Sequence, residues 1–248
     1  MEDLDTARIV PGCADDMLRT LEAFGFEWDG PVVYQSARRA HYAAALAQLS
    51  AGGLIFECSC SRRELEAEAG YPGTCREKPQ RPGPTAARFR VRDEVVAVPD
   101  RLQGECRFAL RERGDVIVRR RDGVFAYQLA VVVDDALQGV TQVVRGADLL
   151  DSTPWQIALQ QALALPTPRY AHLPLVVEPD GAKLSKSGRS VALAPQLRGR
   201  QLFQALALLR QEPPAELELE AAPVVLAWAL AHWEDERLRG VGRVAAPP

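Results

Sequence analysis

The first regular pattern of apolar positions along the chain predicts a helix over residues 13–26, CADDMLRTLEAFGF. Its acidic residues fall in the first turn, where the helix dipole favours negative charge. A second helix is predicted over residues 37–53, which are rich in alanine and end at a Gly-Gly pair, a common signal for the end of a helix. The apolar positions that recur at helical spacing in the first segment are Met17, Leu18, Leu21 and Phe24.

Short strands and irregular sequence follow the second helix. LIFECSC, residues 54–60, predicts a strand that runs into two cysteines, and residues 62–84 are charged and interrupted by Gly and Pro, as in a small irregular insertion. ARFRVRD, residues 87–93, alternates between apolar and polar positions like a strand. DVIVRRRDGVFAY, residues 115–127, predicts a β-hairpin that turns at an Asp-Gly pair.

Strands and helices alternate through the second half of the chain. Residues 128–150 contain a buried element followed by a strand that ends at an Arg-Gly pair. The Ser-Thr-Pro triplet at 152–154 is expected to cap a helix over residues 155–165. HLPLVV, residues 172–177, predicts a strand, and two more helical patterns begin near residue 202. This alternation predicts an α/β fold with a parallel sheet and one insertion.

Composition narrows the class of protein but not its chemistry. The 248 residues, 47% hydrophobic and 25% charged, are enough for one large or two small domains. No run of 18 apolar residues occurs and the first residues are acidic, so we expect a cytoplasmic protein with no membrane partner. The net charge of -3 leaves RNA binding undecided, although Arg88, Arg90 and Arg92, and the arginines at 119–121, could form local basic patches.

Three of the five cysteines, Cys58, Cys60 and Cys75, lie in one short segment. A cluster of cytosolic thiols is more typical of metal binding than of disulfides, and zinc takes four ligands in a tetrahedron. Three thiolates leave one position open, for which Glu68 is an ordinary chemical candidate. The alternative is three reduced thiols in a loop that folds without metal. Cys13 and Cys106 are expected to be ordinary small buried residues.

Lysine is rare in this chain, and its placement is informative. Of the 30 basic residues only three are lysines, and two of them, Lys183 and Lys186, stand three apart in DGAKLSKSGRS, residues 180–190. A solvated turn is the alternative interpretation, but it does not explain two lysines in a protein that otherwise uses arginine. A compact ammonium on a flexible stem is suited to following a phosphate through a reaction.

KLSKS, residues 183–187, resembles the KMSKS signature of class I aminoacyl-tRNA synthetases, a mobile loop that holds the phosphates of ATP. MEDLD, FAYQLAVVVDD, GVTQVVRGADLL and PRYAHLPL occur in the order seen in the glutamyl branch, so the resemblance spans the chain to about residue 190. Only 61 residues follow Ser187, too few for the anticodon-binding domains of an ordinary glutamyl enzyme, since a typical domain needs ~100 residues. The chain therefore looks most like the short subgroup that attaches glutamate to the queuosine base of tRNA(Asp).

The resemblance implies an α/β fold with a class I Rossmann-type parallel sheet and a zinc-containing insertion. We expect residues 1–55 to belong to the first half of the nucleotide-binding core, 56–104 to the zinc-stapled insertion, 105–190 to the second half of the core and 191–248 to a helical C-terminal region. The implied substrates are L-glutamate, ATP with Mg²⁺, and tRNA(Asp) bearing queuosine, with one structural Zn²⁺ and a monomeric protein. 

The resemblance also assigns roles to individual residues. Glu2 faces the α-ammonium of glutamate, while Tyr127 and Arg145 hold carboxylate and side-chain oxygens. From the residues alone, Tyr127 is interpreted as a core aromatic, and the alternative for Arg145 is a surface salt bridge. The adjacent Asp134 and Asp135 point apart in any regular element, so we expect a structural or nucleotide-side role and not a metal pair.

The Lys loop and the metal site receive roles in the same way. Lys186 is implied as the catalytic cation on the ATP phosphates, supported by Lys183, and Ser185 as a further contact to ATP. The family pattern places a tyrosine four residues before the last cysteine, and Tyr71 stands there, which makes it the expected fourth zinc ligand.

One signature of the family is absent from this sequence. The His-x-Gly-His motif that binds ATP opposite the Lys loop does not occur, and EDLD, residues 2–5, normally follows it inside the core. We therefore expect the first strand of the core to be missing, because the chain starts at an internal Met or is a fragment, with a degenerate protein as the other account. The rival functions are a truncated glutamyl-tRNA synthetase and a non-catalytic RNA-binding remnant.

Overall fold

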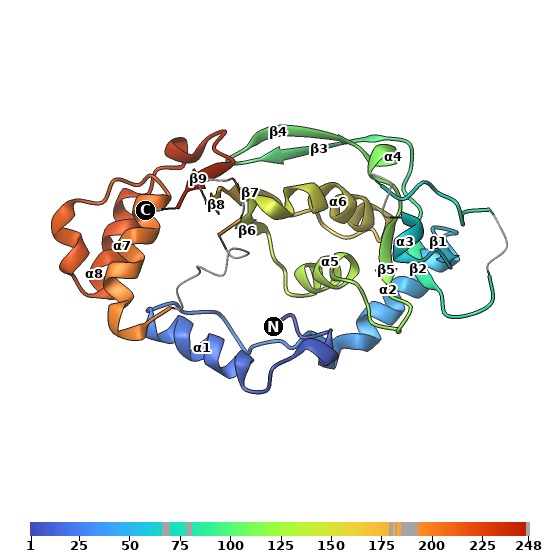
Figure 1. Ribbon diagram of the computed structural model, residues 1–248, viewed down its shortest axis with the longest axis horizontal. Helices are drawn as coiled ribbons and strands as arrows, with labels where there is room; N and C mark the ends of the chain where they lie inside the picture. The colour runs from blue at the N-terminus through green and yellow to red at the C-terminus, as the bar shows by residue number, and fades with distance from the viewer. Residues whose placement is uncertain (66–69, 78–80, 179–180, 182, 185–192, 247–248) are drawn as a thin grey trace.

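A mixed four-stranded sheet forms the centre of the protein in the computed structural model, which describes residues 1–65, 70–77, 81–178, 181, 183–184 and 193–246 (Figure 1). The strand order is β4-β3-β7-β6. β3 and β6 run parallel to β7, whereas β4 runs antiparallel to β3 at the edge. The strands are β3 (Val95–Asp100), β4 (Gly104–Ala109), β6 (Gln142–Gly146) and β7 (Arg169–Leu173).

Helices α2 (Arg39–Ala51), α5 (Tyr127–Leu137) and α6 (Thr153–Ala162) supply much of the main core. α5 packs against both α2 and α6, and α6 packs against β3. Burial of each large apolar side chain stabilises the fold by roughly 1.5–3 kcal/mol, which is why these helices keep fixed positions against the sheet. Side chains with no exposed surface in this core include Tyr42, Val98, Leu110, Leu129 and Leu159.

A second, antiparallel sheet carries the cysteine-rich segment at one end of the molecule (Figure 1). Its order is β1-β2-β5, with β1 at Ile55–Cys58, β2 at Ala86–Phe89 and β5 at Val116–Arg119. The short helices α3 (Arg62–Leu65) and α4 (Leu110–Arg113) flank it. Phe56 and Tyr71 pack with the cysteines into a small cluster separate from the main core.

The C-terminal helices lie at the opposite end of the long axis (Figure 1). α7 (Arg198–Leu208) and α8 (Ala222–His232) pack together around Leu206, Leu217 and Val225. Leu238 joins this region to the central sheet, because it is buried against Leu102 and Ala171. The remaining elements are β8 (Leu175–Val177), β9 (Arg243–Ala245), α1 (Cys13–Ala23) and the 3-10 turns Thr6–Arg8, Gln35–Arg38, Ala147–Ser152, Pro195–Leu197, Ala215–Leu219 and Asp235–Leu238.

Most of the predicted helices are confirmed. The patterns at 13–26 and 37–53 correspond to α1 and α2, and the two C-terminal patterns are α7 and α8. The buried element after residue 127, for which the sequence analysis predicted no helix or strand, is the helix α5. The parallel sheet is confirmed for β3, β7 and β6. Each helix in the described part of the chain is too short or too polar to cross a bilayer.

The predicted hairpin at 115–127 is confirmed but short. Arg119 pairs with Phe125, the N–H of Arg120 donates to the carbonyl of Val124 and that of Ala126 to Val118, and the chain then enters α5. Two other predicted details are wrong. The strand at 172–177 is split by Pro174 into β7 and β8, which belong to different sheets. Ser152 makes no capping hydrogen bond to α6, since its hydroxyl instead accepts one from Gln128.

Candidate functional site

A row of polar side chains crosses three neighbouring strands near their carboxyl ends. Asp100 is the last residue of β3, and His172 and Arg145 stand opposite each other in the register of β7 and β6. β3 and β7 are also in register at Asp100 and Tyr170, which brings Asp100 beside His172. Ligand sites in parallel α/β sheets lie outside the carboxyl ends of the strands, so this row marks the edge where a site is expected.

Arg145 is fixed by contacts on three sides. Its Nε donates to Nε2 of His172 at 3.1 Å, and its Nη1 donates to the Tyr127 hydroxyl at 3.2 Å. Its Nη2 donates to the Thr153 hydroxyl at 2.9 Å and to the side-chain oxygen of Gln156 at 2.7 Å. Arg145 is half-buried and these partners are neutral side chains, so the contacts do not match the alternative interpretation of Arg145 as a surface salt bridge.

Asp100 and His172 form a buried pair behind Arg145. Both side chains have no exposed surface, and Nδ1 of His172 lies 2.6 Å from a carboxylate oxygen of Asp100. The other carboxylate oxygen accepts the backbone N–H groups of Leu102 and Gln103, at 3.0 and 2.8 Å. Burial alone would raise the pKa of Asp100, but these hydrogen bonds, led by that of His172, outweigh it and lower the pKa below its usual value.

Tyr127 begins α5 and faces the same site. Tyr127, Val131 and Asp135 are four residues apart, so they share one face of the helix. Glu2 lines a cavity with Asp134 and Asp135, and its charge acts on Tyr127. Burial, together with the charge of Glu2, raises the pKa of Tyr127 against the opposing effect of Arg145. The structure therefore brings Tyr127 and Arg145 together, with exposed Glu2 close enough to affect their electrostatics.

The two adjacent aspartates have different surroundings. Asp134 is buried and accepts hydrogen bonds from Gln35, Arg38 and Tyr42, which joins α5 to α2 and confirms a structural role. Asp135 turns toward the cavity, and burial raises its pKa to about 6, with Asp134 and Glu2 adding to the rise and Arg145 opposing it. Asp135 thus lines the same cavity as Glu2 and does not share the structural contacts of Asp134.

Of the Lys loop, only part can be placed. Nζ of Lys183 lies 2.5 Å from a carboxylate oxygen of Asp148, three residues beyond Arg145. The loop therefore begins beside the strand that carries Arg145. Lys186 and Ser185 lie outside the described residues.

Cys58, Cys60 and Cys75 converge into one cluster. Their sulfur atoms all lie within 4.8 Å of one another, and those of Cys60 and Cys75 are 3.4 Å apart. Thiolates bound to one Zn²⁺ are separated by about 3.8 Å, given Zn–S bonds of ~2.3 Å and tetrahedral geometry. The donor set fits zinc, and the same residues could hold it with only small adjustments.

The cysteines of this cluster differ in their acidity. Burial, helped by the neighbouring thiols, raises the pKa of Cys60 to about 11. Burial would also raise the pKa of Cys75, but hydrogen bonds from the Tyr71 hydroxyl, the backbone N–H of Ser59 and the two thiols lower it to about 6. A thiol with a lowered pKa favours metal binding, because the thiolate is the ligand. Cys13 is exposed at the start of α1 and Cys106 is partly exposed, so the prediction that both are buried is wrong.

Tyr71 closes one side of the cysteine cluster. Its hydroxyl oxygen accepts the backbone N–H of Cys75 at 2.7 Å, and burial and the thiols of Cys75 and Cys58 raise the pKa of Tyr71. Gly114 lies against the Tyr71 backbone at a φ of 73°, where a Cβ would come within 2.4 Å of the Tyr71 nitrogen. Only glycine fits there, so Gly114 fixes the position of Tyr71. Glu68, the alternative ligand, lies outside the described residues.

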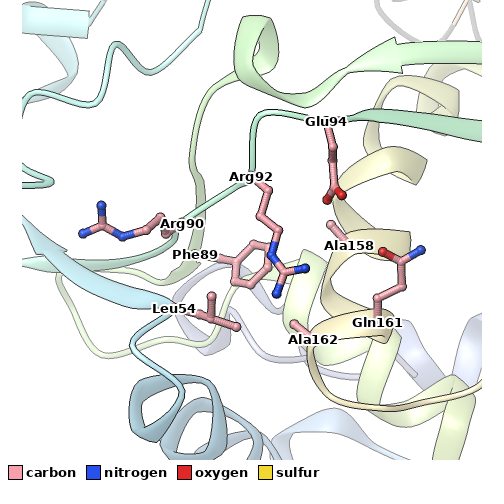
Figure 2. A pocket seen from close by; sticks show the side chains of 8 residues that line it. All are labelled: Leu54, Phe89, Arg90, Arg92, Glu94, Ala158, Gln161 and Ala162. Atoms are coloured by element: carbon pink, nitrogen blue, oxygen red, sulfur yellow. The ribbon is translucent and has the colours of Figure 1, made fainter.

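The arginines at 88, 90 and 92 do not form one basic patch. Arg88 is buried, its guanidinium lies 3.9 Å from the centre of the Tyr71 ring, and its Nε has no partner among the described residues. Arg90 turns toward the Phe56 ring, whereas Arg92 points into a small cavity beside α6, with Glu94 and Gln161 on its other side (Figure 2). The predicted local patch is therefore divided among three environments.

Several residues of the row at the sheet edge had no site role predicted from the sequence. His172 was included in a predicted strand and in PRYAHLPL, a segment of the resemblance, but neither assigned a role to its side chain. Asp100 ends a strand that was not predicted. Gln156 and Thr153 were included in a helix without a role, and only their contacts with Arg145 show what they do.

Comparison with known proteins supports the resemblance. Residues 1–210 match the family described as tRNA synthetases class I (E and Q), catalytic domain. The chain is 54% identical over 240 residues to the glutamyl-Q tRNA(Asp) synthetase of Ectopseudomonas mendocina and 52% identical to that of Pseudomonas aeruginosa, covering 96% of this chain and 82% of each relative. The corresponding protein of Dechloromonas aromatica is 52% identical over 244 residues.

Solved structures share the fold. A glutamate tRNA ligase from Elizabethkingia meningosepticum, in complex with its amino acid, matches 99% of this chain with a TM-score of 0.75 and 21% identity. The glutamate-tRNA synthetase of Elizabethkingia anophelis matches with a TM-score of 0.78 and the same identity. The chain spans 59% and 60% of the length of these two proteins.

Proposed function

The chain belongs to the family of class I tRNA synthetases for glutamate and glutamine, and from this premise we propose that it activates L-glutamate with ATP and transfers it to the queuosine base of tRNA(Asp). Several relatives at 49–54% identity carry the name glutamyl-Q tRNA(Asp) synthetase, which supports this choice within the family. Because ATP, glutamate and tRNA are available in the cytoplasm, we propose that the protein acts there. We also propose that it is a monomer.

The observation that carries the proposal is the guanidinium–phenol pair of Arg145 and Tyr127, with carboxylates beside it. Glutamate has two carboxylates and one ammonium, so its site needs cationic or hydroxyl donors on one side and an anion on the other. Arg145 and Tyr127 would hold oxygens of glutamate. Glu2 would face the α-ammonium, and Asp135 lines the same cavity.

The activation step needs charge stabilisation at the phosphates of ATP. The α-carboxylate of glutamate attacks the α-phosphorus, the bond to the β-phosphate oxygen breaks, and glutamyl-adenylate and pyrophosphate are formed. Lys186, with Lys183 and Ser185, would stabilise the negative charge that develops on the phosphates. Mg²⁺ accompanies ATP in such reactions and offsets part of the same charge. A hydroxyl of the queuosine ring then attacks the acyl carbon and AMP leaves.

We propose a structural role for zinc, held by Cys58, Cys60, Cys75 and Tyr71. Convergence of the three sulfur atoms and the closeness of the Tyr71 hydroxyl to Cys75 support this ligand set. Bound zinc would join segments on either side of the irregular insertion. We also propose the division into residues 1–55, 56–104, 105–190 and 191–248, for which the separate clusters around the cysteines and around α7 and α8 give partial support. The sheets cross the proposed boundary at 104, because β3 belongs to the central sheet and β5 to the sheet that carries the cysteines.

Two assays with matched substrates test the proposed function. We expect glutamate-dependent exchange of pyrophosphate into ATP, followed by transfer of labelled glutamate to tRNA(Asp) that contains queuosine and not to the same tRNA without it. Arg145→Met should abolish exchange, whereas Arg107→Met, on an exposed strand, should not. Transfer to the 3′ end of tRNA(Glu) would instead support a glutamyl-tRNA synthetase, and tRNA binding without exchange would support a non-catalytic protein.

A further inference from the structure

The pair formed by Asp100 and His172 has no role in the proposed mechanism, although both side chains are completely buried. A buried charge is costly unless it is paired and hydrogen-bonded, so such a pair requires an explanation. Asp100 reaches no ligand directly. Its connection to the site runs through His172, which lies between Asp100 on β3 and Arg145 on β6.

The hydrogen bonds of His172 determine its protonation state. Arg145 is a donor only, so Nε2 of His172 must accept the hydrogen bond from Nε of Arg145. The Thr153 hydroxyl, 3.2 Å from Nε2, can also donate to it. Nε2 therefore carries no proton, and the proton of the neutral ring is on Nδ1, where it is donated to Asp100 at 2.6 Å. A doubly protonated ring, or one protonated on Nε2, would place two N–H groups against each other.

The same contacts determine which N–H group of Arg145 remains available to a ligand. A guanidinium has five N–H groups. Contacts with the described residues use one on Nε, both on Nη2 and one on Nη1, the last of which is directed at the Tyr127 hydroxyl. One N–H on Nη1 is left among these contacts, on the side of the guanidinium where Tyr127 lies.

We propose that Asp100 and His172 are positioning residues for Arg145: the neutral, Nδ1-protonated imidazole accepts from Nε and thereby turns Nη1 toward the substrate carboxylate. Asp100 fixes the tautomer and balances the arginine charge across the ring. This inference rests on the proposed glutamate site, because it deepens the assignment of Arg145.

The tautomer can be measured without any substrate. In protein labelled with ¹⁵N-histidine, we expect His172 at neutral pH to show a protonated Nδ1 and an unprotonated Nε2, and only two other histidines, His41 and His232, need to be distinguished from it. Asp100→Asn should change this pattern, because the amide can donate to Nδ1 and shift the proton to Nε2. A wild-type spectrum with a protonated Nε2 would overturn the inference.

A matched pair of substitutions separates positioning from packing. His172→Gln can place an amide oxygen near the position of Nε2 and so accept from Arg145, whereas His172→Asn can place an amide nitrogen near Nδ1 and keeps only the contact with Asp100. Both remove the ring that stacks on Tyr170 and should lower the melting temperature similarly. We expect the Asn variant to weaken glutamate binding about tenfold or more in calorimetry, and the Gln variant much less, with the KM for ATP unchanged in both.

The outcomes distinguish the two proposals. Equal glutamate affinities in the Asn and Gln variants, with a wild type that binds glutamate, would overturn the positioning role alone. A wild type that shows the expected tautomer but binds no glutamate would overturn the proposed function, and this inference with it.

Discussion

Arg145 depends on the shape of its side chain as well as on its charge. Four side chains accept its Nε, Nη1 and Nη2 hydrogens, and an ammonium cannot reach all four from one point. We predict that Arg145→Lys raises the KM for glutamate by about tenfold to a hundredfold, the loss expected for ~1.5–3 kcal/mol of hydrogen bonding to a charged group. Pyrophosphate exchange at varied glutamate concentration measures it.

The control for this substitution is Arg107→Lys, because Arg107 is exposed and pairs only with a neighbouring glutamate. Its kinetics should match those of the wild type. Full activity of Arg145→Lys would show that only the positive charge at this position matters and that the geometry of the guanidinium does not.

Asp135 gives the protein a pH dependence whose sign can be derived. Its pKa in the folded protein, about 6, lies above the ordinary value of 3.8, so the folded state binds the proton more tightly than the unfolded chain. Its contribution to stability is therefore complete below pH 4 and is lost as the pH rises to about 6. We predict that the melting temperature of the wild type falls relative to that of Asp135→Asn across this window.

The same ionisation should act in the opposite direction on ligand binding. An ionised Asp135 attracts an ammonium, so glutamate affinity should increase as the pH rises through about 6. Asp135→Asn should flatten this increase in calorimetric titrations. If the slopes of the two proteins were the same, another group, such as Glu2, would be responsible.

Among the elements, the cysteine-rich segment has the smallest core of its own. Its cluster consists of Phe56, Tyr71 and the cysteines, with Leu65 beside it, so a metal would supply much of its order. We predict that purified protein contains about one zinc per chain and that Cys75→Ser or a strong chelator makes residues 59–81 susceptible to limited proteolysis while the central sheet stays resistant. Cys106→Ser should retain the zinc and the resistance.

Arg88 places a positive charge beside the proposed zinc site of this segment. Zinc with three thiolates and a phenolate has a net charge of about -2, and Arg88 is a buried cation against the Tyr71 ring. We predict that Arg88→Met weakens zinc binding about tenfold in a competition titration with a chromophoric chelator, because it removes ~1–3 kcal/mol of charge compensation. Arg90→Met, which removes a more exposed neighbour, should change the affinity little.

Elements with strong local patterns could be predicted, and those defined by distant partners could not. α1 and α2 follow directly from apolar spacing and composition and from glycine or acidic end signals. β3 is different, because VVAVPD shows no contrast between its two faces and contains Pro99, which argues against a strand. Its alternating burial arises only from packing between α6 and the paired strands.

At the scale of the whole molecule, substitutions in the main core and in the cluster between α7 and α8 should have different effects on stability. Leu129 has no exposed surface in the main core, and Leu129→Ala should destabilise the protein by ~2–5 kcal/mol in chemical denaturation. Leu206→Ala should instead speed hydrogen exchange mainly in α7 and α8, because its cluster is separate. The exposed Leu230 provides the control, with an expected change within about 0.5 kcal/mol for Leu230→Ala.

The candidate site shows the same division between local and global information. The chemistry of the Lys loop, the cysteines and the pair of Tyr127 and Arg145 could be proposed from short segments and their resemblance. The convergence of Asp100 with Arg145 could not, because 45 residues separate them and their meeting depends on the position of β7 between β3 and β6. Strand order is a property of the complete fold.

Because Asp100, His172 and Arg145 are connected across β3, β7 and β6, specificity for the amino-acid substrate depends on three positions together and not on Arg145 alone. Replacing Arg145 to admit an uncharged substrate would leave Asp100 as a buried anion without its counter-charge, at a cost of several kcal/mol. A mutant library that randomises position 145 alone would therefore yield mostly destabilised proteins. Libraries that vary positions 100, 145 and 172 jointly can reach neutral combinations, and natural changes of specificity at this edge should occur by concerted replacement in strands far apart in the gene.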